Sequence, residues 1–254
     1  MSTGWDNVAV WYDEYLKGDD TYQSQVILPN LLRVVDAQNG DRILDVASGQ
    51  GYFARAFAQS GAQVVGIDAS AELIDAAERA SEGVKVAYKV GNAEKLDEVP
   101  GVYDAAVCVL AFENMKNIPA VLSGVATALK DGGRFVVVML HPAFRIPQHS
   151  DWTYSKEHDV QSRKVGKYLS EVAIPIELNP FKNKQQGNKK VTTTTYHRPL
   201  QWYMKAFKKS GFVISGLEEW ISHKKSQSGP RQHAEDVARK EFPMFLMVEL
   251  KKLL

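Results

Sequence analysis

The sequence predicts an α/β protein with a doubly wound, mostly parallel, seven-stranded sheet. Short apolar runs alternate with helical patterns between residues 42 and 140, as repeated β-α-β units require. The run at 134–140 (RFVVVML) is apolar almost throughout, which is typical of a strand buried on both faces. Ligands of such sheets bind at the carboxyl ends of the strands. We therefore expect a binding site there.

Each element follows from a local pattern of apolar and turn-forming residues. Ser70 is expected to cap the helix that follows it. Strands are predicted at 42–47, 63–68, 84–90, 105–110, 134–140, 212–220 and 243–250. Helices are predicted at 52–59, 71–81, 119–129 and 200–209. Five polar residues fall at the strand ends: Asp45, Asp68, Asn92, Glu113 and His141.

The chain divides into three parts. Residues 1–40 carry apolar and aromatic side chains at helical spacing and are expected to form a helical cap. Residues 41–141 and 200–254 are expected to form the core. Residues 142–199 break the alternation and contain two β segments, which predict an inserted β-hairpin that serves as a lid over the strand ends.

Composition and charge exclude several classes of protein. The formal net charge is +1, so charge alone favours neither nucleic acid nor a membrane surface as a partner. Cys108 is the single cysteine, so no internal disulfide and no cysteine metal cluster is expected, and no metal site is predicted. The first residues are acidic, unlike a secretory signal, and no apolar run reaches the roughly 18 residues that span a bilayer. We expect a cytoplasmic protein.

A glycine-containing loop follows the first strand. Its spacing, Gly49-x-Gly51-x-x-Ala54, satisfies the dinucleotide-binding fingerprint, and Asp68 lies where such folds place a ribose-binding acid. The loop alone therefore does not separate a nicotinamide enzyme from a methyltransferase. Asp45, directly before the loop, suits the amino group of a methionine moiety and would repel a pyrophosphate.

Longer segments carry a resemblance to a known family. ILDVASGQGYFARAFAQSGAQVVGIDAS (43–70) resembles the first motifs of Rossmann-like (class I) methyltransferases, and VGNAEKL (90–96) resembles their adenine-contacting motif. The segments YDAAVCVLAFENM and DGGRFVVVMLHPAF occupy the expected places. The resemblance implies the Rossmann-like methyltransferase fold, S-adenosyl-L-methionine as cofactor, and methyl transfer to an O, N or C atom of a small molecule. The segments HPAFRIP and YHRP resemble a bacterial branch of the family that acts on small molecules. A monomer or a homodimer is expected.

The resemblance also implies roles for individual residues. Asp68 would hold the ribose hydroxyls, Asn92 and Ala93 the adenine, and Asp45 the amino group. Ala47 replaces a glycine of the family pattern, and Asn92 replaces an aspartate, which removes a charge-assisted hydrogen bond. The cofactor-binding residues expected are Asp45, Ala47, Gly49, Gly51, Asp68, Ala69, Asn92, Ala93, Leu110, Tyr15 and Gln23.

A hydroxyl acceptor also requires a base. The candidate catalytic residues are His141, Glu113, His197 and Tyr168. His141 has an alternative role as a hydrogen-bonded residue of the lid hinge. The His197-Arg198 pair has an alternative role as a lid anchor, or Arg198 recognises a carboxylate on the substrate.

Two other functions stay open. A tRNA methyltransferase would use the lysines of the predicted hairpin tip to bind phosphate, although a solvated turn explains such lysines more often. These are Lys182, Lys184, Lys189 and Lys190. The absence of an N/D-P-P-Y/F run after the fourth strand argues against methylation of adenine bases. A non-catalytic protein that binds S-adenosylmethionine is the second alternative.

Overall fold

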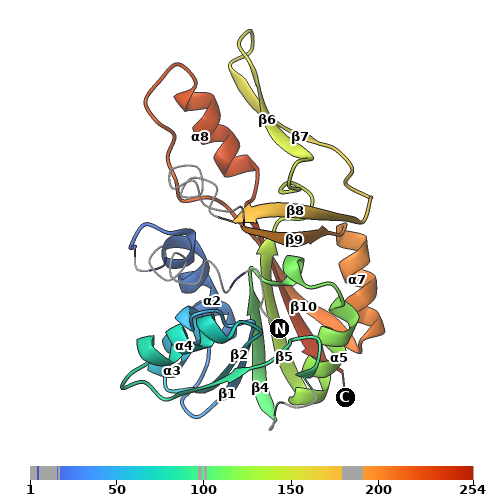
Figure 1. Ribbon diagram of the computed structural model, residues 1–254. Helices are drawn as coiled ribbons and strands as arrows, with labels where there is room; N and C mark the ends of the chain where they lie inside the picture. The colour runs from blue at the N-terminus through green and yellow to red at the C-terminus, as the bar shows by residue number, and fades with distance from the viewer. Residues whose placement is uncertain are drawn as a thin grey trace.

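A seven-stranded sheet forms the centre of the molecule (Figure 1). The computed structural model describes residues 5, 16, 18–96, 99, 102–178 and 191–253. The sheet has the order β10-β11-β5-β4-β1-β2-β3, and β11 is antiparallel to both of its neighbours. Its strands are β1 (Arg42–Val46), β2 (Gln63–Asp68), β3 (Val86–Val90), β4 (Tyr103–Val109), β5 (Leu129–Leu140), β10 (Phe212–Trp220) and β11 (Phe245–Lys252). The predicted doubly wound, mostly parallel sheet is confirmed.

Helices cover both faces of this sheet (Figure 1). Three of the predicted helices begin where the sequence places them, and Ser70 caps α4 by accepting a hydrogen bond from the Leu73 amide. The helical elements are η2 (Gln23–Ile27), α2 (Leu28–Val35), α3 (Tyr52–Gln59), α4 (Ala71–Ala80), η4 (Phe112–Asn114), α5 (Ile118–Ala128), α7 (Leu200–Lys209) and α8 (Gln232–Glu241). The first of them is a π-helix and η4 is a single 3₁₀ turn.

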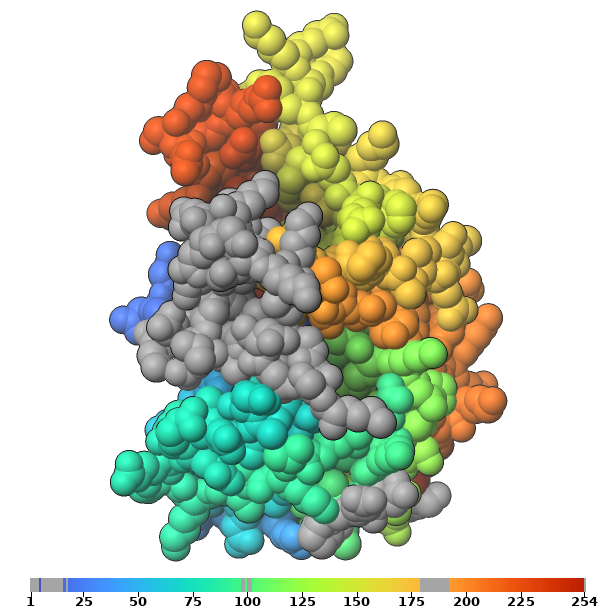
Figure 2. All heavy atoms as spheres, viewed as in Figure 1, coloured from blue at the N-terminus to red at the C-terminus, as the bar shows by residue number. Residues whose placement is uncertain are grey.

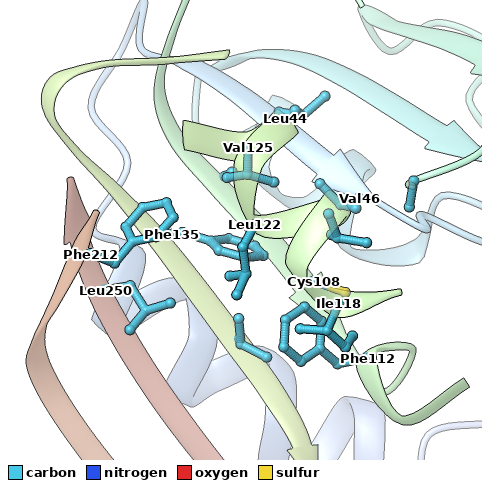
Figure 3. Close-up of a cluster of buried hydrophobic side chains, with 14 of the residues drawn as sticks. Leu44, Val46, Cys108, Phe112, Ile118, Leu122, Val125, Phe135, Phe212 and Leu250 are labelled. Atoms are coloured by element: carbon cyan, nitrogen blue, oxygen red, sulfur yellow. The ribbon is translucent and has the colours of Figure 1, made fainter. Parts of the chain in front are cut away.

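The core has one layer on each face of the sheet. Successive side chains of a strand point to opposite faces, so Leu44 and Val46 of β1 pack toward α5 and α7 whereas Ile43 packs toward α2 and α3. Figure 3 shows the first layer, where Phe112 and Phe135 lie beside Leu122 of α5 and its neighbours. Burial on both faces explains the near-continuous apolar runs of β4 and β5.

Most strand boundaries that differ from the prediction do so by one or two residues, and the largest difference is at the start of β5. β5 begins at Leu129, before the Asp131–Gly133 turn that was expected to precede it, and an irregularity opposite Tyr103 and Ala105 accommodates the extra residues. β11 ends at Lys252, two residues later than expected, because Lys252 still pairs with Phe212, the first residue of β10.

The inserted segment forms two hairpins, not the single hairpin that the sequence predicted. The expected one pairs β8 (Val172–Leu178) with β9 (Val191–His197). The unexpected one pairs β6 (Ser150–Ser155) with β7 (Val160–Val165) and projects from the molecule beside α8 (Figure 2). It escaped prediction because its strands are mostly polar and partly exposed on both faces, so they lack an apolar alternation.

No helix in the described ranges combines the length and the apolar character that a membrane crossing requires.

Candidate functional site

A cavity of about 360 Å³ lies at the carboxyl ends of four neighbouring strands, β4, β1, β2 and β3. This is the edge at which the sequence predicted a ligand site. Eight of the eleven expected cofactor residues line it: Asp45, Ala47, Gly49, Asp68, Ala69, Asn92, Ala93 and Leu110. The cavity size lies within the range usual for small-molecule sites, about 300–1,000 Å³.

The backbone of the glycine loop is left-handed at several positions. Ala47 has φ of 59°, Gly49 of 56° and Gly51 of 77°. Across the cavity, Leu110 has φ of 53°, and its amide donates to the Val138 carbonyl oxygen at 2.7 Å. Strained non-glycine residues persist where the surrounding structure holds them, and they concentrate at ligand sites. Ala47 and Leu110 both line this cavity.

Replacing Ala47 with glycine should raise the free energy of unfolding. A left-handed alanine costs about 1–2 kcal/mol, and the greater backbone entropy of glycine in the unfolded chain offsets about 0.5–1 kcal/mol of that gain. We expect the urea midpoint of Ala47→Gly to rise by the equivalent of up to about 1 kcal/mol, with an unchanged slope. A lower midpoint would show that the alanine side chain contributes packing that outweighs the strain.

The Asp68 carboxylate connects the glycine loop to the start of α4. Its Oδ2 accepts from the Gly49 amide and its Oδ1 from the Ser70 amide, each at 2.9 Å. Each oxygen of an ionised carboxylate has more than one acceptor position. Asp68 therefore stabilises the loop and also lines the cavity, where a carboxylate suits the hydroxyl groups of a ligand.

Asp45 is a buried acid that forms no ion pair with any described residue. Its side chain is 1% exposed, and Oδ2 has no hydrogen-bond partner among the described residues. Its pKa is raised to about 7, mainly by burial and also by the negative charge of Asp68, while a hydrogen bond from the Ala54 amide acts in the opposite direction. A buried unpaired acid is costly. A cationic group of a ligand would pair with the Asp45 carboxylate and offset the cost of burying it. The site around Asp45 is therefore suited to an ammonium group.

We expect Asp45→Asn to stabilise the ligand-free protein in a pH-dependent way. The folded-state pKa of Asp45 is raised, so its ionisation destabilises the native state increasingly between about pH 4 and 7, and fully above pH 7. The shift corresponds to at most about 4 kcal/mol. Urea unfolding at pH 4 and pH 8 should show a gain for the variant only at pH 8. An equal gain at both pH values would contradict the assignment of a buried, charged Asp45.

The end of β3 supplies a turn that faces the same cavity. The Asn92 side-chain oxygen accepts from the Glu94 amide at 2.8 Å, and Glu94 accepts from the Asn117 amide at 2.8 Å. Ala93 is buried between them. These bonds fix the turn from β3 to the start of α5, so the Ala93 backbone and the Asn92 side chain hold a defined position at the cavity wall.

Three expected cofactor residues do not line the cavity in the described structure. Gly51 packs under Tyr88, where an added Cβ would lie 2.1 Å from the tyrosine oxygen. Gln23 is buried in η2, where its Oε1 has no hydrogen-bond partner in the part of the chain that the structure describes. Tyr15 lies outside the described residues.

Several wall residues were not assigned to the site from the sequence. Trp5 belongs to the N-terminal segment, which was expected only to form a helical cap. Residues such as Phe53 and Met115 give no chemical signal, because apolar side chains at these spacings are equally expected in the core. The additional wall residues include Trp5, Leu16, Tyr52, Phe53, Asn114, Met115 and Thr193.

Two of the four candidate catalytic residues, Glu113 and His197, line a second, smaller cavity next to η4 and β9. Glu113 Oε1 is 3.5 Å from the Leu140 amide, and its buried Oε2 has no partner within the described ranges. Burial raises the pKa of Glu113 to about 7. His197 Nε2 donates to the Tyr168 carbonyl oxygen at 2.8 Å, and burial lowers its pKa.

The other two candidates lie outside the described walls of both cavities. His141 is 2% exposed, its Nδ1 accepts from the Ala143 amide at 3.2 Å, and its Nε2 lies 2.7 Å from Glu219. Burial lowers its pKa, so the neutral ring with a proton on Nε2 fits both contacts. The Tyr168 hydroxyl accepts from the Leu200 amide at 3.3 Å. This geometry favours structural roles for both.

Cys108 is not placed to act as a nucleophile. It is fully buried in β4, and burial raises its pKa well above the usual value. A reactive cysteine requires accessible thiolate. The interpretation of Cys108 as a small apolar core residue is consistent with its position among Val46, Phe112 and Ile118 (Figure 3).

Comparisons with known proteins identify the class. Residues 43–133 match the family model described as a methyltransferase domain. The chain is 25% identical to an S-adenosylmethionine-dependent methyltransferase from Mesorhizobium loti, with a TM-score of 0.70 over 92% of this chain and 99% of that one. The structure of an S-adenosylmethionine-dependent methyltransferase from Clostridium acetobutylicum shares the fold, with a TM-score of 0.60 and 17% identity. The match covers 99% of this chain and 100% of that one. The predicted resemblance to Rossmann-like (class I) methyltransferases is confirmed: residues 43–133 match the family model, and the fold is shared with the structures of such methyltransferases.

Curated relatives match over a shorter range. The ubiquinone biosynthesis O-methyltransferase of Xanthomonas euvesicatoria is 36% identical over 105 residues, which are 40% of this chain and 44% of the relative. The enzyme of the same name from Burkholderia ambifaria is 39% identical over 97 residues, 37% of this chain and 42% of the relative. The chain thus covers less than half of the length of these relatives.

Proposed function

We propose that this protein is an S-adenosylmethionine-dependent methyltransferase that acts on a small-molecule acceptor. The observation that carries the proposal is the buried Asp45 carboxylate beside the glycine loop, whose Oδ2 has no hydrogen-bond partner among the described residues. A pyrophosphate next to this acid would be repelled, whereas the ammonium group of a methionine moiety would pair with it. The methyltransferase relatives support the same cofactor.

Different residues of the larger cavity bind different parts of the cofactor. Asp45 holds the ammonium group, Asp68 accepts from the two ribose hydroxyls, and the turn at Asn92 and Ala93 holds the adenine. Leu110 and the glycine loop form the walls between these positions. The bound cofactor supplies an activated methyl group. The protein's contribution is to orient it and to exclude water, because charge disperses in the transition state of such a transfer.

Glu113 is the proposed general base for a hydroxyl acceptor. A base is most effective when its pKa lies near the working pH, and the raised pKa of Glu113, about 7, meets that condition. It lies on η4, whose next residue, Asn114, lines the larger cavity. His197, on the second cavity wall, is the alternative base.

Residues 142–199 serve as the lid, together with the N-terminal cap of residues 1–40. β9 supports this proposal because Thr193 lines the larger cavity and Thr195 lines the second one. From the N-terminal part, Trp5 and Leu16 line the larger cavity. Closure of such segments excludes water from the reacting groups.

A turnover experiment separates this function from its alternatives. The protein is incubated with S-adenosylmethionine and one of two sets of acceptors: small hydroxyl compounds such as catechols, or total tRNA. The formation of S-adenosylhomocysteine is measured, and the Asp68→Ala variant is the control. We expect turnover with a small acceptor. Turnover with tRNA alone, weakened steeply by salt, would favour the RNA methyltransferase. Cofactor binding without turnover on any acceptor would favour the non-catalytic binding protein.

A further inference from the structure

The second cavity is lined by two cationic side chains, each with one buried hydrogen-bond donor that is unused within the described ranges. Arg145 and Arg198 both line it together with Glu113. Arg145 Nε and Arg198 Nη1 are buried and have no hydrogen-bond partner in the described part of the chain. Buried polar groups of native proteins are nearly always paired, and a buried charge without a partner is especially costly. Such donors point to a ligand that supplies the acceptor atoms.

Arg198 is held in a fixed orientation. Its Nη2 donates to the carbonyl oxygens of Met115 at 2.9 Å and Lys116 at 2.8 Å. Its guanidinium lies over the rings of Trp202 and Tyr196, 4.9 and 5.2 Å from their centroids. The residue is 5% exposed. These contacts use one end of the guanidinium fork and leave Nη1 available at the cavity.

Arg145 adds a second positive charge at the same cavity. Its Nη2 lies 3.4 Å from the Phe242 carbonyl oxygen. Its pKa is lowered to about 10, mainly by burial and also by the nearby positive charge of Arg163. Neither Arg145 nor Arg198 forms an ion pair with a described acidic residue. Glu113 lines the same cavity and supplies one negative charge when it is ionised, so the two arginines still leave an excess of positive charge there.

We propose that the methyl acceptor carries a carboxylate, and that Arg198 and Arg145 bind this group at the second cavity. The proposal rests on the proposed function. A planar carboxylate matches the guanidinium fork and gains charge-assisted hydrogen bonds from both arginines. Binding there orients the rest of the acceptor past Glu113 toward the larger cavity.

The two cavities adjoin at one side-chain contact. Thr195 Oγ1, on the wall of the second cavity, donates to Asn114 Oδ1, on the wall of the larger one, at 3.1 Å. The second cavity measures about 20 Å³, room for roughly one water molecule. Only the acid group of an acceptor reaches it, and opening of the Thr195–Asn114 contact makes room for that group.

The test compares acids with their neutral amides. The probes are 3,4-dihydroxybenzoate, 4-hydroxyphenylacetate and 3-hydroxybutyrate, each with the corresponding amide, titrated by calorimetry with and without S-adenosylhomocysteine. We expect the wild type to bind at least one acid 10- to 100-fold more tightly than its amide. Arg198→Lys, which keeps the charge but not the fork, and Arg145→Gln should each reduce this preference at least about tenfold. The matched control, Arg33→Gln on an exposed ion pair with Glu218, should retain it.

The outcomes separate this proposal from the proposed function. If the protein binds S-adenosylhomocysteine but binds acids and amides equally well, or binds none of the acids, the carboxylate proposal is overturned. The methyltransferase proposal is unaffected by that result. Failure to bind S-adenosylhomocysteine overturns the methyltransferase proposal. A preference for acids that survives in both folded arginine variants also overturns the assignment. Arg145→Gln provides the decision if Arg198→Lys does not fold.

Discussion

Replacing Asp68 with alanine should weaken the binding of S-adenosylhomocysteine by about 10²- to 10⁴-fold. The variant loses two charge-assisted hydrogen bonds to the ribose hydroxyls, each contributing roughly 1.5–3 kcal/mol. It also releases the Gly49 amide, which the carboxylate holds at 2.9 Å. Calorimetric titration of the folded variant measures the change directly.

Asp104 provides the matched control. Like Asp68 it accepts from a backbone amide, that of Arg42, but it lies at the opposite ends of the strands, where β1 begins. Asp104→Ala should lower the free energy of unfolding and leave the affinity for S-adenosylhomocysteine unchanged. Equal affinity in Asp68→Ala and the wild type would refute the ribose site.

Replacing Glu113 with glutamine should lower kcat by 10²- to 10⁴-fold with a hydroxyl acceptor, because this is the usual contribution of a general base. Glutamine has nearly the same shape but does not accept a proton. The base form of Glu113 predominates above its pKa of about 7. The kcat/KM of the wild type should therefore rise with pH through about 7, and the variant should lack that limb.

Two readouts distinguish this role from a structural one. The affinity of Glu113→Gln for S-adenosylhomocysteine should remain within about threefold of wild type, since Glu113 does not line the described wall of the larger cavity. Glu72→Gln, an exposed change on α4, should leave both kcat and the pH profile intact. If Glu113→Gln keeps the wild-type pH profile, the base is another group, and His197 becomes the first to test.

The sequence predicted the sheet well because its strands are buried on both faces. The apolar runs of β4 and β5 and the polar residues after them locate both the strands and the ligand edge. The β6–β7 hairpin could not be predicted in this way, because its strands SDWTYS and VQSRKV are mostly polar. They therefore lack the alternation of apolar and polar residues that identifies a strand. Its pairing depends on tertiary contacts that a single sequence does not show.

The cofactor side of the site followed from local motifs, whereas the acceptor side did not. Asp45, Gly49 and Asp68 lie within 24 residues of one another, and the turn geometry of the loop brings them together. Glu113, Arg145 and Arg198 are far apart in the sequence and meet only because η4, β9 and the segment after β5 converge. Burial in the folded chain raises the pKa of Glu113 and leaves one donor nitrogen of each arginine without a hydrogen-bond partner among the described residues.

Thermal stabilisation by three ligands tests the central claim most directly. The melting temperature of the purified protein is measured with S-adenosylmethionine, S-adenosylhomocysteine or NAD, each in large excess. A ligand that binds only the folded state raises the melting temperature according to its concentration relative to Kd. Binding at Asp45 and Asp68 predicts a rise with both adenosyl compounds and none with NAD. A rise with NAD alone would contradict the account and identify the Gly49-to-Ala54 loop as a dinucleotide site.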